Sequence, residues 1–302
     1  MSIDTVFLVG TLFSGSTLLG RDLTANLADC HYIGEMNNLT QFPSLSHPGT
    51  PSNCHPCYAL RQDCPYFTDE LVKSASWEDI GGLHASLREA FDASVIIDGS
   101  KYVAWLQAAA AQSAGQMPHA AVVITVRNPI AFAQSHSHRT ADPLWLGGVI
   151  WRDTYVDALR TVNGYGLPSI VVRYEDFMAD PVSTRARVAA LIGQSVLPAA
   201  RPHRLHECGG NWSSLVPYLG AAEVTRLIEG LPLAEQRVEA QAFLTKARAY
   251  WQDGAPRADN RWVHSLDAGA ANAILSQPGL ADVASLLGYN VAELAARAIR
   301  AA

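Results

Sequence analysis

The stretch from Val6 to Leu27 constrains the fold of this chain more than any other. It begins with four apolar residues, continues as a loop of small residues from Gly10 to Thr17, and ends in a segment with leucines at helical spacing. A buried strand followed by a glycine loop and a helix start directs backbone N–H groups and a positive helix end toward an anion. The pattern predicts a phosphate-binding strand, loop and helix. A tight strand-to-helix turn without a ligand is the alternative.

The loop keeps the glycine spacing of a Walker motif but lacks its lysine. In G-x-x-x-x-G-K-[ST] the lysine reaches the phosphates of a nucleoside triphosphate. Gly10 and Gly15 keep the spacing here, and Ser16 stands at the position of that lysine. The loop is therefore predicted to hold a phosphate-like group in a protein that is not a nucleoside triphosphatase. A P-loop kinase of small molecules remains an alternative, disfavoured by the missing lysine.

Composition excludes several classes of protein. The chain has 302 residues, of which 49% are hydrophobic and 17% charged, as in ordinary globular proteins. A net charge of −6 without basic clusters argues against a nucleic-acid partner. No run approaches the roughly 20 apolar residues of a membrane helix, and the first residues lack the basic region of a signal peptide. We expect no membrane partner and a cytoplasmic location.

Short apolar runs alternate with helical segments along the first two thirds of the chain, which predicts an α/β fold. The expected architecture is a P-loop-like, mostly parallel sheet of about five strands with helices on both faces. One domain over 1–302 is expected, with a cysteine-bearing loop and helix insert at 36–93, loop-like over 36–68, and a mainly helical part without strands at 197–302. Besides the first strand, strands are predicted at 31–35, 95–98, 121–126 and 170–174, and helices at 77–93, 103–110, 129–139, 144–162 and 181–192.

Two charged residues lie at the ends of predicted strands. Because α/β sheets bind ligands beyond the carboxyl ends of their strands, Glu35 is placed for acid or base chemistry; a solvated loop carboxylate is the alternative. Lys101 follows the strand at 95–98, in the first turn of a helix that Ser100 is predicted to cap. A cation is poorly placed there for the helix dipole, which suggests either solvation or the binding of an anion.

A second anion site is predicted after the strand at 121–126. Arg127 ends that strand, and Asn128-Pro129 supplies a helix cap followed by proline at the first helical position. Ser135 and Arg139 lie on one face of the helix that follows. Arginine forks match phosphate oxygens, so two arginines and a hydroxyl at one edge predict a phosphate site; a solvated Arg139 is the alternative.

Three cysteines stand in a C-x2-C-x6-C pattern at Cys54, Cys57 and Cys64. Zinc usually takes four ligands, so His47 or His55 would have to complete a metal site. Structural thiols or a facultative disulfide are the alternatives.

These motifs together resemble those of the sulfotransferases that use 3′-phosphoadenosine 5′-phosphosulfate (PAPS), over nearly the whole chain. The first loop is similar to the family's 5′-phosphosulfate loop, except that Phe13 replaces its arginine. The segment from Arg127 is similar to the 3′-phosphate strand and helix, and the cysteine pattern resembles an insert of bacterial members. The resemblance implies a set of PAPS-binding residues: Phe13, Ser14, Gly15, Ser16, Thr17, Leu18, Arg127, Ser135, Arg139 and Tyr174.

The layout is closest to the tyrosylprotein-type members, whose catalytic glutamate follows a glycine. Gly34-Glu35 matches that pair and Lys101 matches a lysine that they carry. The steroid and phenol type has a histidine base where this chain has Val103. The resemblance implies in-line sulfuryl transfer from PAPS to a hydroxyl or amine of a small-molecule or carbohydrate acceptor. Glu35 would be the base, Lys101 would stabilise the leaving oxygen, and the chemistry would require no metal.

The missing loop arginine leaves alternatives open. A protein that binds PAPS or its product 3′-phosphoadenosine 5′-phosphate (PAP) with weakened catalysis is one of them. Lys101 is the expected replacement for the missing charge, with Arg21 the less favoured one. If Glu35 is not the base, the candidates are His31, His136 and His138.

Overall fold

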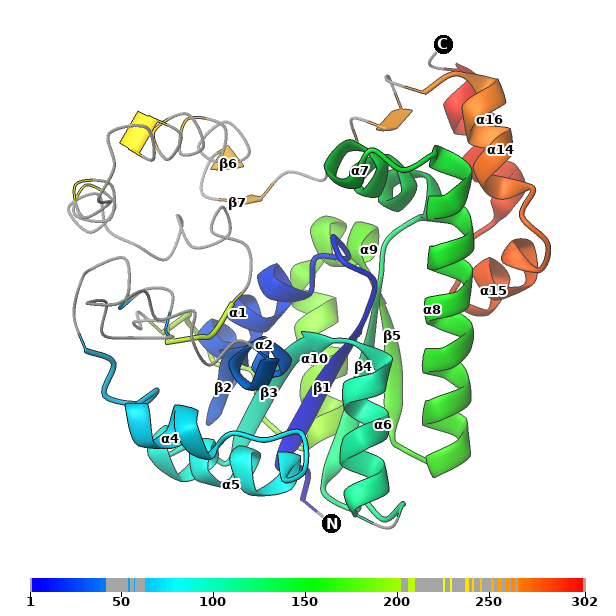
Figure 1. The fold of residues 1–302 in the computed structure, drawn as a ribbon. Helices are drawn as coiled ribbons and strands as arrows, with labels where there is room; N and C mark the ends of the chain where they lie inside the picture. Colours follow the sequence, from blue (N-terminus) through cyan, green and yellow to red (C-terminus); the bar gives the residue numbers. More distant parts are fainter. Residues whose placement is uncertain are drawn as a thin grey trace.

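The computed structural model describes residues 2–41, 54, 57, 63–113, 115–201, 206–209, 259–260, 262–263 and 266–300, with isolated helical positions and two short strands between 225 and 256. A five-stranded sheet lies at its centre, in the order β2-β3-β1-β4-β5 with every neighbouring pair parallel (Figure 1). The strands are β1 (Thr5–Gly10), β2 (Cys30–Gly34), β3 (Val95–Lys101), β4 (Ala120–Val126) and β5 (Ser169–Arg173). The predicted parallel α/β sheet is confirmed.

Alternating side chains of β1 enter two separate cores. Phe7 and Val9 face one core, and Val6 and Leu8 face the other. The second core is closed by α1 (Ser16–Asn26), α9 (Tyr174–Ala179) and α10 (Pro181–Ile192). The first is closed by α2 (Met36–Gln41), α4 (Asp69–Ser74), α5 (Ile80–Ala90), α6 (Val103–Gln112), α7 (Pro129–Thr140), α8 (Leu144–Tyr165), α14 (Ala268–Leu275), α15 (Leu280–Leu286) and α16 (Val291–Arg300). Helices therefore cover both faces of the sheet, as predicted.

Helix ends follow the capping residues. Asn128 caps α7 by accepting the Ala131 amide at 2.8 Å, Asp180 caps α10, and Gly193 ends α10 with φ of 70°. The helix predicted from 77 begins only at Ile80, because Asp79 accepts the Gly82 amide and fixes the start there.

Several predicted boundaries are wrong. The stretch expected as loop from 36 begins with α2, and a separate short helix, α4, precedes α5. Beyond 197, where no strand was expected, two-residue strands β6 (Trp251–Gln252) and β7 (Ala255–Pro256) pair antiparallel. The helices predicted at 129–139 and 144–162, in contrast, are observed as α7 and α8.

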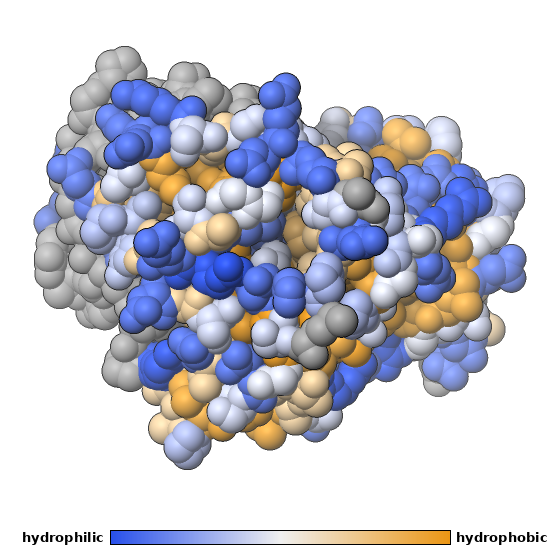
Figure 2. Space-filling model, turned by 90° about the horizontal axis from the view of Figure 1, so that it is seen from below, coloured by the Kyte–Doolittle hydropathy of each residue, from blue (hydrophilic) through white to orange (hydrophobic). Residues whose placement is uncertain are grey.

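Hydrophilic and hydrophobic side chains are interspersed on the face at the amino-terminal ends of the strands (Figure 2). Within the part of the chain that the structure describes, no helix combines the length and the apolar character needed to cross a membrane.

Candidate active site

The loop between β1 and α1 lies at the carboxyl end of the central strand. Gly15, at the start of α1, has φ of 87°, and a Cβ there would lie 2.6 Å from the Tyr174 ring. Glycine is required for this packing, which joins the loop to the end of β5. Ser14 donates to the Thr125 hydroxyl at 3.0 Å, which in turn donates to the Val9 carbonyl. The loop is thus fixed on three neighbouring strands before any ligand binds.

One hydroxyl in this loop has no partner among the described residues. Ser16 is the first residue of α1 and is 1% exposed, yet its Oγ makes no hydrogen bond to any described residue. A buried polar atom without a partner costs free energy, and the helix start beside it presents free N–H groups. An anion at this helix end would satisfy both.

Arg127 follows β4 and is buried against the same loop. Its guanidinium lies 5.0 Å from the centre of the Tyr174 ring and forms an ion pair with Asp259 at 3.0 Å. Trp151 donates to the Arg127 carbonyl at 2.8 Å. The Nε atom of Arg127 is buried without a partner in the described chain. The structure therefore brings Arg127 and Tyr174 to the loop, and it adds a carboxylate that sequence reasoning missed.

The other two predicted phosphate ligands lie on α7, which begins two residues after Arg127. Ser135 is partly buried and Arg139 exposed on α7, and neither side chain bonds to another described residue. Between them His136 stacks on Phe132 and pairs with Asp142 at 2.9 Å. Both side chains are open to a partner, and their role as phosphate ligands stays a prediction.

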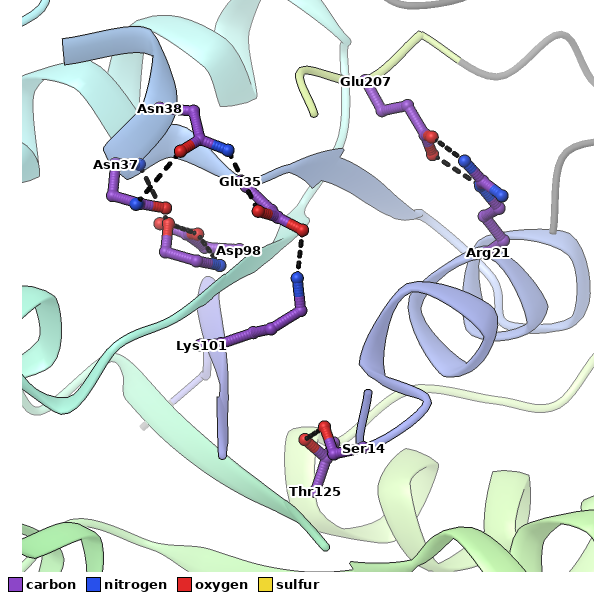
Figure 3. A network of polar contacts seen from close by, with 10 residues as sticks. Ser14, Arg21, Glu35, Asn37, Asn38, Asp98, Lys101, Thr125 and Glu207 are labelled. Atoms are coloured by element: carbon purple, nitrogen blue, oxygen red, sulfur yellow. Dashed lines mark hydrogen bonds and ion pairs between the residues drawn. The ribbon is translucent and has the colours of Figure 1, made fainter. Parts of the chain in front are cut away.

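Glu35 and Lys101 form an ion pair at the ends of adjacent strands (Figure 3). Their side chains are 12% and 8% exposed. Asn38, in the first turns of α2, donates to the second oxygen of Glu35 at 3.0 Å. The carboxylate is thus held from both sides, with an ammonium on one oxygen and an amide on the other.

The expected cap of α6 by Ser100 is wrong, because Asp98 binds that side chain. Ser100 donates to Asp98 through both its amide and its hydroxyl, and its hydroxyl accepts the Asn37 amide. Tyr102 occupies the cap position instead, without a side-chain hydrogen bond. Lys101 accordingly ends β3 rather than beginning the helix, with φ of 66° in the left-handed region.

Asp98 is itself a buried anchor behind the ion pair. It is 1% exposed and accepts from His84 at 2.8 Å and Trp105 at 2.7 Å, as well as from Ser100. A carboxylate with this many donors is well satisfied in a protein interior. It fixes the backbone that presents Lys101.

The backbone of the described segment 206–209 also holds Glu35 in place. The Glu35 amide donates to the Cys208 carbonyl, and the Cys208 amide donates to the Ile33 carbonyl at 2.9 Å. A Cβ on Gly34 would lie 2.0 Å from that Cys208 carbonyl, so only glycine permits this approach. Burial, with the nearby Glu35 and Glu207 charges, raises the pKa of Cys208 to about 12.

Glu207 forms a bidentate ion pair with Arg21 of α1, and both side chains are fully buried (Figure 3). Arg21 is therefore engaged away from the loop. This ion pair disfavours Arg21 as the source of the positive charge that is lost where Phe13 replaces the loop arginine.

Among the described residues, the three cysteines of the insert converge with His206, which completes a set of four. His47 and His55 lie outside the described residues. Hydrogen bonds from Cys54 and then Cys57 hold the pKa of Cys64 below its usual range, whereas burial raises the pKa of Cys54.

No protein-family model and no curated protein matches the chain. Solved structures match it along nearly its whole length. The sulfotransferase domain from the curacin biosynthetic pathway has a TM-score of 0.53 and 14% identity, over 95% of this chain and 98% of that chain. The sulfotransferase domain from the Synechococcus PCC 7002 olefin synthase has a TM-score of 0.51 and 20% identity, over 95% and 94%. This chain has the sulfotransferase fold.

In this sulfotransferase fold, the predicted site residues Arg127, Glu35 and Lys101 lie at strand ends as expected, and their role stays a prediction. Their partners Asn38, Asp98 and Asp259 were not predicted. Asn38 carries a local signal, since it lies one helical turn after Glu35. Asp259 carries none, because 132 residues separate it from Arg127.

Proposed function

We propose that this protein is a sulfotransferase that moves a sulfuryl group from PAPS to a hydroxyl or amine of a small-molecule or carbohydrate acceptor. The observation that carries the proposal is the Glu35–Lys101 ion pair at the carboxyl ends of β2 and β3. A base and a cation thus stand together where α/β proteins bind ligands.

The residues present fit a ligand with two anionic ends. The Ser16 hydroxyl at the start of α1, which bonds to none of the residues that the structure describes, suits the 5′-phosphosulfate. The buried Arg127, whose Nε bonds to no described residue, suits the 3′-phosphate, since guanidinium forks bind phosphate oxygens. Ser135 and Arg139 are candidates for further contacts to the same phosphate. Phe13, Thr17 and Leu18 complete the proposed binding loop.

In the proposed reaction Glu35 accepts the proton of the acceptor hydroxyl or amine as that atom bonds to sulfur. The bond from sulfur to the bridging oxygen breaks, and its electron pair stays on the 5′-phosphate of PAP. Lys101 leaves Glu35 to stabilise this developing charge. As in phosphoryl transfer, alignment and charge stabilisation supply most of the catalysis.

The test is ligand-dependent stability. We expect PAP to raise the free energy of unfolding by about 2.7 kcal/mol at a hundredfold excess over its Kd, without a divalent ion. Arg127→Ala should lose most of this shift, because it removes a charge-assisted contact. Arg88→Ala is the matched control, since Arg88 pairs with Asp4 before β1, at the other end of the sheet. An undiminished shift in Arg127→Ala would refute the second anion site.

Two other functions give different results. A P-loop kinase would be stabilised by ADP with magnesium rather than by PAP. A PAP-binding protein with weakened catalysis, suggested by Phe13, would show the shift but transfer no label from PAPS to any member of an acceptor panel.

A further inference from the structure

Four side chains from distant parts of the sequence converge beside the proposed active site. Cys54, Cys57 and Cys64 meet His206, which lies 142 residues beyond the last cysteine. Their ligand atoms all lie within 4.8 Å of one another. The four residues are between 0% and 6% exposed.

The spacing fits tetrahedral coordination. The Nδ1 atom of His206 lies 3.7, 3.3 and 3.4 Å from the three sulfurs. Bond lengths of about 2.3 Å to sulfur and 2.05 Å to nitrogen at a tetrahedral angle place the two kinds of ligand atom about 3.6 Å apart. One imidazole nitrogen within 3.3–3.7 Å of three sulfurs therefore matches the arrangement that a central ion requires.

The surroundings support a closed site. The Phe67 amide donates to the Cys64 sulfur at 3.4 Å, a contact that stabilises thiolate charge. The Tyr66 ring packs edge-on against His206 with 4.7 Å between centres, and His31 bonds to the His206 carbonyl at 3.2 Å. Such outer contacts orient metal ligands and exclude water.

A disulfide accounts for less of this arrangement. It would consume two sulfurs and leave a third beside an imidazole with no common partner. The five cysteines of the described chain are all free thiols. Three thiolates and one histidine form instead a complete set for structural zinc, with no position left open for a substrate.

We propose that Cys54, Cys57, Cys64 and His206 bind one zinc ion that joins the cysteine-bearing insert to the segment 206–209. Because Cys208 of that segment holds the backbone of Gly34 and Glu35, the ion fixes the edge of the active site from outside. The site does not depend on the proposed sulfuryl transfer, and no step of that reaction passes through the metal.

The direct experiment is elemental analysis of protein purified without chelator. We expect about one zinc per chain, released by a strong chelator and regained on adding zinc. Cys57→Ser and His206→Ala should each reduce the zinc content at least tenfold. Cys30→Ser is the control, because Cys30 is a buried thiol of β2 outside the cluster and should leave the zinc content unchanged.

Two measurements on the unaltered chain keep the test valid if the variants misfold. Cobalt in place of zinc should give thiolate-to-metal charge-transfer absorption and the ligand-field bands of a tetrahedral site. Alkylation followed by peptide mass spectrometry should find the three cluster cysteines protected with zinc and labelled after chelation. Protein without zinc, zinc that survives in Cys57→Ser, or a mass showing a disulfide within the cluster would each overturn the proposal. A failure to bind PAP would leave it intact.

Discussion

Glu35 is the residue whose replacement should separate binding from chemistry. Glu35→Gln keeps the shape and the contact from Asn38 but cannot accept a proton. We expect kcat to fall by roughly 10²–10⁴, the usual contribution of a general base, while the Kd of PAP changes little. Turnover of labelled PAPS and calorimetry with PAP measure the two effects. Wild-type kcat in this variant would direct attention to the histidines, of which His136 already pairs with Asp142.

Lys101 is expected to carry the charge that Phe13 does not supply. Lys101→Met keeps the apolar stem and removes the ammonium. Losing a charged donor to the transition state commonly costs about 2–4 kcal/mol, so transfer should be nearly abolished while PAP binding stays largely intact. Single-turnover assays compare the variant with Lys101→Met combined with Phe13→Arg, which should recover part of the rate if the arginine fits. Near-normal turnover by Lys101→Met alone would assign the charge to another residue.

Asp259 forms an ion pair with Arg127, the residue that is proposed to bind the 3′-phosphate. Both side chains of the pair are 8% exposed, so phosphate has to replace the carboxylate in a poorly hydrated place. Asp259→Asn removes this competition, and we expect PAP to bind about tenfold more tightly by calorimetry. Weaker binding would instead show that Asp259 orients Arg127 for its ligand.

At the scale of elements, the Arg21–Glu207 pair ties α1 to the segment 206–209. Removing one member of a buried pair leaves the other charge unpaired, so Arg21→Met should lower the free energy of unfolding by about 3–5 kcal/mol. The double variant Arg21→Met with Glu207→Met should be less destabilised than the single one. Denaturant unfolding of both variants measures this difference. Equal losses would show that the pair contributes through packing rather than charge.

Elements whose signals are local were predictable from the sequence. The buried run of β4 followed by Asn128-Pro129 gave a strand, a cap and a helix start that the structure confirms. Ser100 does not cap α6 because its hydroxyl donates to Asp98, two residues earlier. Residue propensity alone does not tell whether a serine hydroxyl will bind a helix amide or a nearby carboxylate. His206 and Asp259 were missed as partners because they are placed by tertiary contacts over more than 130 residues, which leave no periodic pattern.

At the scale of the molecule, Tyr289 joins the C-terminal helices to the proposed nucleotide site. Its hydroxyl donates to Glu175 at 2.6 Å, and Glu175 accepts the Asn128 amide at the start of α7. Burial raises the pKa of Tyr289 well above its usual value, so the hydroxyl stays a donor across the working pH range. Tyr289→Phe should cost about 1–3 kcal/mol in unfolding free energy, measured by denaturant titration, because Glu175 loses a buried partner. An unchanged stability would mean that the C-terminal helices are held by packing alone.

The position of β2 at the end of the strand order has a consequence for behaviour in a crowded solution. An uncovered edge strand offers unpaired amides and carbonyls to any other chain and promotes aggregation. Here the Cys208 amide bonds to the Ile33 carbonyl, and just before β2 the Ala28 amide bonds to the Ser195 carbonyl. The chain thus shields its own sheet edge with segments that follow α10. Whatever loosens the segment 206–209 should expose that edge, and self-association would then precede global unfolding.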